Sequence, residues 1–339
     1  MQQVFITAVG GPETLELREM RDPEPAADEL RIRVQASGIN FADILARKGL
    51  YPDAPRLPCV VGYEVAGVVD AAGPGADAAW LGREVLALTR FGGYADIVVV
   101  PQAQVFAKPA GLSFAQAAAI PVNYLTAWQL MVVMGSLSAN ETVLIHNAGG
   151  GVGLAAIDVG RQIGARLIGT ASTAKHAFLQ ARGLDAAIDY TRGDWRPELM
   201  RLTAGRGVEL ILDPLGGRHW KKSYRALRHT GRLGMFGIST ATETKLPGVL
   251  KLVAIALGLP WFNPIPLMNN NRAVFGVNLG HLWHEGEKTR GWMQTLLDGV
   301  AAGWVRPHVD REFPLAQAGA AHAHIEARRN TGKVVLRIA

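Results

Sequence analysis

The stretch that decides the fold is Glu141-Thr-Val-Leu-Ile-His-Asn-Ala-Gly-Gly-Gly-Val-Gly153. Thr142–Ile145 has the composition of a short buried strand, and the apolar residues of Val152–Ile163 recur at helical spacing. A strand that passes through a glycine-rich turn into a helix is the context in which a G-x-G-x-x-G pattern binds a dinucleotide. We therefore predict a dinucleotide-binding turn here, with Gly150 and Gly153 at the second and third glycine positions.

If this turn binds a dinucleotide, each of its parts has a physical role. Gly150 lets the backbone approach a pyrophosphate, and Gly153 lets the helix pack closely on the strand. The free N–H groups of the first helical turn, from Gly151 and Val152 onward, bind phosphate oxygens. The alternative is an ordinary loop, which the regular pattern of the following residues disfavours.

Strand and helix patterns alternate after the turn. The expected strands are 166–170, 186–189, 208–212, 232–236 and 273–277, and the expected helices are 173–182, 195–202 and 220–227. Repeated strand–helix units of this length predict a parallel sheet with helices on both faces.

The residues on either side of this region have a different pattern. Short β-rich runs punctuated by glycine and proline lie at 30–36, 64–70, 84–88 and 94–100, and a helix at 287–301 precedes a β-rich tail that ends in a strand at 333–338. The predicted fold class is α/β, a doubly wound Rossmann sheet inserted into a discontinuous β-rich domain. The predicted boundaries are 1–123 with 280–339 for the β-rich domain and 124–279 for the Rossmann domain.

The end of the second strand of the Rossmann region indicates which dinucleotide is bound. An NAD site usually has an acidic residue there, whereas this strand runs through Gly169-Thr-Ala-Ser172-Thr-Ala-Lys175. A hydroxyl at Ser172 and a cation at Lys175 suit the 2′-phosphate of NADPH. The alternative is that Ser172 or Thr173 caps the next helix and that Lys175 is solvated.

Charge and cysteine content exclude some classes of protein. The chain has 339 residues and a net charge of +6, but its basic residues form no stripe, so we expect no nucleic-acid partner. The excess charge fits either attraction of anionic ligands or a solvated surface. The single cysteine, Cys59, cannot form an internal disulfide, which favours a cytoplasmic location. The longest apolar stretch, Leu252–Phe262, is too short for a membrane span, and we expect a buried helix or a lid.

Further motifs resemble one known family over almost the whole chain. They are Gly38-Ile-Asn-Phe-Ala-Asp43, Leu50-Tyr-Pro52, Pro58–Val69, Pro121–Trp128, Gly169–His176, Ile188–Tyr190, Leu212–Gly217 and Asn271–His281. In this order they resemble the zinc-free quinone-oxidoreductase branch of the medium-chain dehydrogenase/reductase superfamily, and within it the synaptic vesicle membrane protein (vesicle amine transport) group. The resemblance implies that the β-rich domain is GroES-like and is split around the Rossmann domain.

The resemblance also implies site residues. Those implied for NADPH are Asn40, Thr126, Gly150, Gly151, Val152, Ser172, Lys175, Tyr190, Phe236, Gly237, Phe275, Val277 and Asn330. Simple packing explains Thr126 and Tyr190 equally well. Asn40 and Tyr51 are the implied catalytic hydrogen-bond donors. The second tyrosine of many quinone oxidoreductases is absent, because Ile44-Leu45 stands in its region.

The zinc-binding members of the superfamily have cysteine and histidine where this chain has Asn40 and Tyr63, so we expect no metal. The pairs His281/His284 and His322/His324 have tolerable ligand spacing, but histidines of this kind are more often surface residues. Without a Lewis acid, hydride transfer needs an electron-poor acceptor. We therefore expect an NADPH-dependent enzyme that reduces a small apolar quinone or α,β-unsaturated carbonyl compound.

Two alternatives stay open. One is a 2-enoyl thioester reductase of the same superfamily, and the other is a cofactor-binding protein with a non-catalytic role. The resemblance further implies a homodimer that pairs through the edge strand Ala273–Val277 of the Rossmann sheet.

Overall fold

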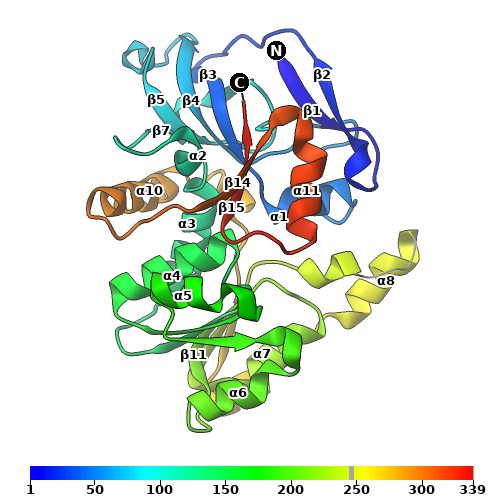
Figure 1. Ribbon diagram of the computed structural model, residues 1–339, viewed down its shortest axis with the longest axis vertical. Helices are drawn as coiled ribbons and strands as arrows, with labels where there is room; N and C mark the ends of the chain where they lie inside the picture. Colours follow the sequence, from blue (N-terminus) through cyan, green and yellow to red (C-terminus); the bar gives the residue numbers. More distant parts are fainter. Residues whose placement is uncertain (244–247, 339) are drawn as a thin grey trace. The chain divides into compact units, whose positions relative to one another are not determined.

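The computed structural model describes residues 1–243 and 248–338 (Figure 1). The chain divides into two compact units, one made of Met1–Leu125 with Leu279–Ala339 and the other of Thr126–Asn278. Helix α3 (Pro121–Trp128) contains the first boundary. The boundaries expected from the sequence follow residues 123 and 279.

The second unit contains a six-stranded parallel sheet with the order β10-β9-β8-β11-β12-β13. Its strands are β8 (Thr142–Ile145), β9 (Arg166–Ala171), β10 (Ala186–Asp189), β11 (Val208–Asp213), β12 (Leu227–Met235) and β13 (Ala273–Gly276). The chain adds strands first on one side of β8 and then on the other. Ligands of α/β proteins bind where the strand order reverses in this way, at the carboxyl ends of the strands.

Helices cover both faces of this sheet, as the alternating pattern predicts. They are α4 (Gly151–Ile163), α5 (His176–Arg182), α6 (Trp195–Leu202) and α7 (Arg218–Arg225), and the unit also contains α8 (Gly248–Gly258) and α9 (Pro264–Asn270). Figure 1 shows α4 and α5 over one face and α6 and α7 over the other. Gly160 allows α4 to lie close to β9, since a Cβ there would come within 2.6 Å of Leu167. The predicted doubly wound sheet is confirmed.

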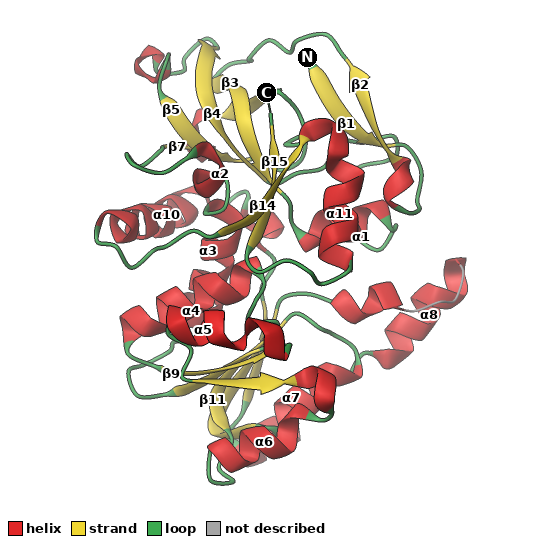
Figure 2. Ribbon diagram, viewed as in Figure 1, coloured by secondary structure: helices red, strands yellow, loops and turns green. Residues whose placement is uncertain are grey.

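The first unit is dominated by antiparallel strands (Figure 2). Its main sheet has the order β14-β15-β3-β4-β5-β7, with β6 also paired to β3, and β1 pairs with β2 separately. The strands are β1 (Gln2–Ile6), β2 (Leu15–Glu19), β3 (Glu29–Gly38), β4 (Glu64–Ala72), β5 (Glu84–Leu88), β6 (Ile97–Pro101), β7 (Val105–Ala107), β14 (Val309–Pro314) and β15 (Lys333–Arg337). The tail therefore adds its strands to those of the N-terminal segment, as the predicted discontinuous domain requires.

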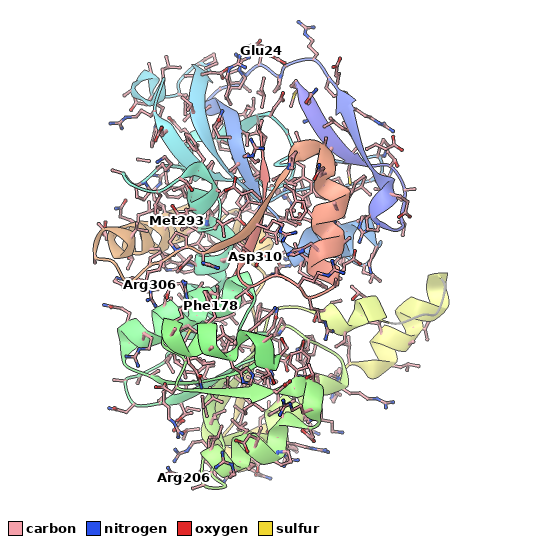
Figure 3. All side chains as sticks on the ribbon, in the orientation of Figure 1. Glu24, Phe178, Arg206, Met293, Arg306 and Asp310 are labelled. Atoms are coloured by element: carbon pink, nitrogen blue, oxygen red, sulfur yellow. The ribbon has the colours of Figure 1, made fainter. Side chains whose placement is uncertain are left out.

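This unit also contains helices. They are α1 (Phe41–Arg47), α2 (Phe114–Ala117), α10 (Gly286–Ala301) and α11 (Ala318–Glu326). The interior is aliphatic, with Leu30, Ile32 and Val85 fully buried in one cluster. On α10 Met293 is fully buried, whereas Glu24 and Arg206, on loops of the two units, project from the surface (Figure 3).

Three sequence expectations need correction. The tail is not purely β-rich, because α11 lies within it. The helix expected at 220–227 ends at Arg225, and Leu227 already begins β12. The β1–β2 hairpin was missed.

The apolar stretch Leu252–Phe262 was expected to be buried or to form a lid. Residues 252–258 belong to α8, but Leu257 is 82% exposed and Trp261 is 92% exposed. The expectation of a buried helix is therefore wrong for these residues. In the part of the chain that the structure describes, no helix has the length and apolar character needed to cross a membrane.

Candidate active site

The glycine-rich turn emerges between the strands that flank β8. The N–H of His146 donates to Leu212 O at 3.1 Å, and the N–H of Ala148 donates to Thr170 O at 3.1 Å. Asn147 between them has a φ of 53°, so the backbone reverses there before entering α4. The turn is thus fixed at the carboxyl edge of the sheet, where β8 lies between β9 and β11.

Steric constraints explain the glycines of the turn. A Cβ at Gly153 would come within 2.5 Å of Ala148 O, and a Cβ at Gly150 would come within 2.7 Å of Asn147 Nδ2. No side chain caps α4 at Gly150, and the first turn of α4 carries no acidic residue. The amide groups at this helix terminus therefore have the arrangement of an anion site.

Ser172 and Lys175 follow β9 at the same edge of the sheet. Ser172 makes no capping hydrogen bond with its side chain, so the alternative capping role does not apply to it. The side chain of Lys175 lies against the turn, because a Cβ at Gly149 would be 2.8 Å from Lys175 Cδ and 3.7 Å from Lys175 Nζ. The Lys175 side chain thus lies beside the glycine turn, and Ser172 directly follows the neighbouring strand β9.

An acid at the end of the neighbouring strand escaped the sequence analysis. Asp189 of β10 is the register partner of Ala171, directly before Ser172. It accepts hydrogen bonds from the backbone and hydroxyl groups of both Thr173 and Thr191. These hydrogen bonds, that from the Thr173 hydroxyl foremost, hold the pKa of Asp189 well below its ordinary value. The carboxylate already has its acceptor sites filled, which disfavours a role as a ribose-binding acid.

The other predicted cofactor residues fall into three groups. Phe236, Gly237 and Val277 directly follow the ends of β12 and β13, near the carboxyl edge. The Phe275 ring instead packs over the sheet, since a Cβ at Gly234 would lie 2.9 Å from Phe275 Cζ. The remainder are Thr126, buried in α3, Tyr190, which begins a 3-10 turn after β10, and Asn40, Tyr51 and Asn330, which belong to the other unit.

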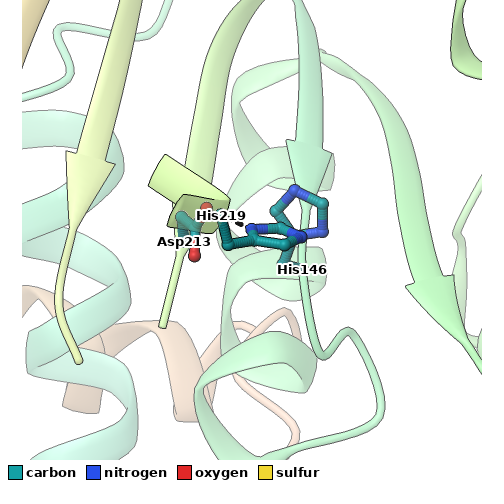
Figure 4. A group of neighbouring side chains, drawn as sticks. All are labelled: His146, Asp213 and His219. Atoms are coloured by element: carbon teal, nitrogen blue, oxygen red, sulfur yellow. Dashed lines mark hydrogen bonds and ion pairs between the residues drawn. The ribbon is translucent and has the colours of Figure 1, made fainter. Parts of the chain in front are cut away.

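A buried polar network anchors the start of the glycine turn (Figure 4). Trp195 Nε1 donates to His219 Nε2 at 3.1 Å, so His219 Nδ1 is the nitrogen that donates to Asp213 at 2.7 Å. The Ser223 hydroxyl also donates to Asp213, at 2.6 Å, and its oxygen then accepts from His146 Nε2 at 3.2 Å.

The protonation states of this network follow from burial. Burial lowers the pKa of His146 to about 3, so the ring is neutral. Burial is the largest influence and raises the pKa of Asp213, but the hydrogen bonds from His219 and Ser223 and the neighbouring histidines together bring it below its ordinary value. The network therefore holds one buried carboxylate among neutral donors, and it ties the residue before the glycine turn to α7.

The same side chains have the spacing of a metal site. Ligand atoms of His146, Asp213 and His219 all lie within 4.8 Å of one another. The Ser223 hydroxyl, however, lies among them, at 2.6 Å from Asp213, 3.2 Å from His146 and 3.4 Å from His219. An ion at the centre would have to displace this hydroxyl and break the hydrogen bonds that satisfy the three ligands.

A second buried network lies in the first unit. Lys333 Nζ donates to Asn40 Oδ1 at 2.6 Å and pairs with the carboxylate of Glu64. Asn40 Nδ2 donates to Glu64 Oε1 at 3.1 Å and to Gly38 O at 3.3 Å. Glu64 Oε2 accepts from the backbone N–H of Val122 at 2.7 Å. Lys333 and Glu64 thus form a buried ion pair, and the side-chain amide of Asn40 bonds to both of them.

This geometry changes the role that we assign to Asn40. Both amide hydrogens have internal acceptors, so the expected donation from Asn40 to a substrate oxygen has no support in this geometry. The space around the pair is tight, since a Cβ at Gly38 would come within 2.7 Å of both Glu64 and Lys333. We therefore regard Asn40 as part of the scaffold.

Next to this pair, Asp43 is fully buried. It accepts from Asn40 N at 2.7 Å, Gly62 N at 3.1 Å and Tyr94 Oη at 3.1 Å. Burial raises the pKa of Asp43 to about 7, although these hydrogen bonds and Lys333 act in the opposite direction.

Two of the tail histidines, His322 and His324, differ from their expected surface positions. His322 is fully buried, 2.9 Å from Tyr94 Oη, and burial lowers its pKa to about 3. His324 is half-buried and bonds to Asp310 at 2.9 Å. His281 is exposed, as expected, and bonds to Asp53 at 2.7 Å.

The positions that hold zinc elsewhere in the superfamily do not fit a metal here. Asn40 Oδ1 is already bonded to the Lys333 ammonium, and a second cation beside it would be repelled. Tyr63 is a buried phenol whose pKa burial raises far above its ordinary value, so it offers no anionic ligand. Cys59 is packed in the hydrophobic core, and burial raises the pKa of its thiol.

Tyr63 also supplies a hydroxyl that the sequence analysis did not consider. Its ring lies edge-on to Tyr51, with centroids 6.2 Å apart and an interplanar angle of 84°. The two tyrosines are separated in the sequence, and no regular element between them orients both. No periodicity of the sequence could therefore have paired them.

Comparisons with known proteins agree with this architecture. Residues 26–110 match the family of the Alcohol dehydrogenase GroES-like domain, and residues 182–336 match the Zinc-binding dehydrogenase family. The chain is 36% identical to the human Synaptic vesicle membrane protein VAT-1 homolog, over 98% of this chain and 85% of that protein. It is 33% identical to a Quinone oxidoreductase of Pseudomonas aeruginosa, over 99% of each.

Solved structures are similar to this chain over nearly its whole length. The Escherichia coli quinone oxidoreductase complexed with NADPH has a TM-score of 0.87 at 28% identity and covers 99% of this chain and 100% of its own. The CurK enoyl reductase has a TM-score of 0.85 at 27% identity and covers 100% and 99%. An NAD-dependent alcohol dehydrogenase has a TM-score of 0.85 at 32% identity and covers 100% of both chains.

The fold, the order of the motifs and the length of these matches agree. The chain belongs to the medium-chain dehydrogenase/reductase superfamily of oxidoreductases, in the group that contains the VAT-1 homologs and the quinone oxidoreductases.

Proposed function

We propose that this protein is an NADPH-dependent reductase that transfers hydride to a quinone or an α,β-unsaturated carbonyl compound without a metal ion. The observation that carries the proposal is the combination of an uncapped glycine turn with Lys175 lying against Gly149, and Ser172 follows the same strand three residues before Lys175. The complex of the Escherichia coli quinone oxidoreductase with NADPH supports the same choice of cofactor.

The cofactor preference rests on charge and hydrogen bonding. The helix-terminal amides of Gly151 and Val152 would bind the pyrophosphate, and Ser172 with Lys175 would bind the 2′-phosphate. Asp189, the acid nearby, is engaged by two threonines. Because one similar structure is that of an NAD-dependent alcohol dehydrogenase, a titration that compares NADPH with NADH is the test of this preference.

When bound, NADPH supplies a hydride to an electron-poor carbon of the acceptor. The chain contributes hydrogen bonds to the acceptor oxygen that gains negative charge, and we assign that donation to the Tyr51 hydroxyl. Asn40 holds the scaffold through Lys333 and Glu64. The final proton can come from water.

The proposed independence of zinc follows from the donor set at Asn40 and Tyr63. Protein purified without an affinity tag should contain substoichiometric zinc by elemental analysis, and a chelator should leave turnover unchanged. Loss of activity to the chelator, with recovery on adding zinc, would disprove this part of the proposal. Ser223→Ala is the informative control, since it removes the hydroxyl that lies among His146, Asp213 and His219.

A 2-enoyl thioester reductase is the second candidate, and the similarity to the CurK enoyl reductase favours it. Both reactions place hydride on the β-carbon, so the acceptor separates them. Turnover should be compared for quinones, short enones and enoyl thioesters at equal NADPH concentration. A higher kcat/KM for the thioesters than for the other two classes would select the second candidate.

Two further parts of the proposal concern assembly and location. We propose a homodimer that pairs through β13, because this strand ends the sheet and leaves backbone groups for another strand. Light scattering at micromolar concentration tests it, and a monomer mass would contradict it. We also propose a cytoplasmic location, since the one cysteine, Cys59, is a buried free thiol.

A further inference from the structure

Tyr63 is a buried phenol that no part of the proposed mechanism uses. It is 9% exposed, and its hydroxyl meets hydrogen-bond geometry with no group among the described residues. Buried polar groups without a partner are rare in native proteins, and each needs a physical explanation. The neighbouring acid Asp43 does not supply one, because Asn40, Gly62 and Tyr94 already donate to it.

The backbone holds Tyr63 in place on both sides. The N–H of Thr89 donates to Tyr63 O at 2.8 Å, and the Thr89 hydroxyl donates to Gly62 O at 2.8 Å. Gly62 has a φ of 104°, and a Cβ there would come within 2.7 Å of Tyr94. The ring of Phe91 packs on Tyr63 with centroids 5.3 Å apart. The hydroxyl therefore projects from a rigid base.

The group that faces this hydroxyl is Tyr51. The two rings meet edge to face at 6.2 Å, and Tyr51, on the turn after α1, is the less buried of the two. Burial raises the pKa of Tyr63 far above its ordinary value, and the neighbouring Tyr51 hydroxyl raises it further, as do the charges of Asp43 and Asp53. A phenol with so high a pKa stays protonated at physiological pH and acts as a donor.

We propose that Tyr63 is a positioning residue, whose hydroxyl donates a hydrogen bond to the Tyr51 oxygen and so directs the Tyr51 hydrogen toward the oxygen of the acceptor. The inference rests on the proposed function, which assigns Tyr51 to that oxygen. Hydrogen bonds in a chain polarise one another, so Tyr51 becomes a stronger donor while Tyr63 donates to it. The pair supplies the second phenol that Ile44-Leu45 lacks.

A double-mutant cycle tests the coupling. Tyr63→Phe should lower kcat for an enone about tenfold, with little change in the KM for NADPH. In a Tyr51→Phe background the same change should have almost no effect, because its partner is gone. Tyr224→Phe is the matched control, as it removes another buried hydroxyl without a partner, in the other unit, and should leave turnover unchanged. Independent, multiplicative losses from the two substitutions would overturn the proposal.

A second measurement does not depend on turnover. The chain has six tyrosines, so 13Cζ-tyrosine NMR gives few enough signals to assign by single Tyr→Phe variants. Tyr63→Phe should raise the titration midpoint of Tyr51 by about 0.5 to 1 pH unit, because a donor to its oxygen is lost. An unchanged Tyr51 signal and midpoint would overturn the pairing even in an active enzyme. The expected shift in a protein inactive on every acceptor would sink the proposed function and leave the pairing intact.

Stability separates a positioning role from a structural one. A single hydrogen bond to the half-buried Tyr51 contributes little to the free energy of unfolding, so the melting temperature of Tyr63→Phe should be close to or above that of the wild type. A clearly lower melting temperature together with lower activity would mean that Tyr63 supports the fold, and the proposal would be wrong.

Discussion

The ammonium group of Lys333 lies 2.6 Å from the amide oxygen of Asn40, across 293 residues of sequence. It also pairs with Glu64, which is fully buried. The C-terminal strand β15 is therefore held to the first motif of the chain by a buried ion pair, and the carboxylate depends on Lys333 for its countercharge.

Loss of one partner should be costly. Lys333→Met leaves a buried carboxylate without a countercharge and should reduce the free energy of unfolding by about 3–5 kcal/mol. Glu64→Gln in the same chain removes that charge, so the double variant should be more stable than Lys333→Met alone. Urea unfolding of the wild type, both single variants and the double variant gives the comparison. Additive losses would show that the pair is not coupled.

The contact of Lys175 with the glycine turn leads to a prediction about affinity. Lys175→Ala should weaken NADPH binding by about tenfold and leave NADH binding nearly unchanged, because only NADPH carries the 2′-phosphate. Lys221→Ala, which removes an exposed lysine of α7, is the control for net charge. Fluorescence titration of both cofactors measures the effect. Equal affinities for NADPH and NADH in the wild type would contradict the assignment.

Gly153 should tolerate no side chain. A Cβ there would meet Ala148 O at 2.5 Å and Asn147 O at 2.6 Å, and both are backbone atoms that cannot swing aside. Gly153→Ala should therefore distort the turn, lower NADPH affinity more than tenfold and destabilise the protein by about 1–3 kcal/mol. Gly291 of α10 has open space around it, so Gly291→Ala should be neutral or stabilising. Retained NADPH affinity in Gly153→Ala would refute the close approach.

Asp43 should make stability depend on pH. Its pKa is about 7 in the folded protein against an ordinary value of 3.8, so the folded state binds the proton more tightly than the unfolded state between these values. Protonated Asp43 therefore stabilises the folded protein fully below about pH 4, and this stabilisation is lost as pH rises through 7. The stability difference between wild type and Asp43→Asn should therefore fall by up to about 4 kcal/mol over this range.

Unfolding curves at intervals from pH 4 to pH 8 measure this difference. Asp298→Asn, at an exposed carboxylate of α10, is the control for loss of one charge. A constant difference between wild type and Asp43→Asn across the range would show that Asp43 stays ionised when buried.

The Rossmann unit was predictable because its signals are local. The glycine turn, the apolar strand before it and the helical spacing after it lie within 23 consecutive residues, Glu141–Ile163. The alternation of strands and helices in this unit then follows from their side-chain periodicities, about 2 residues in a strand and about 3.6 in a helix, which differ clearly. Helix α7 begins and ends two residues before its predicted bounds, because the apolar side chain of Leu227 suits both the end of a helix and the start of a strand.

The networks that shape the candidate site were not predictable from one sequence. Lys333, Glu64 and Asn40 meet only when β15 pairs with β3, and no spacing in the sequence encodes that register. His322 was expected at the surface because its burial depends on Tyr94, 228 residues away. Tyr63 was read only as a missing zinc ligand, and its contact with Tyr51 depends on how two turns pack.

The central claim is conjugate reduction by NADPH, and the most direct measurement follows the transferred atom. The protein should be incubated with C4-deuterated NADPH and an enone, and the product examined by NMR. The account predicts a saturated carbonyl compound with deuterium on the β-carbon. An allylic alcohol with deuterium on the former carbonyl carbon would contradict it and would assign a carbonyl reduction instead.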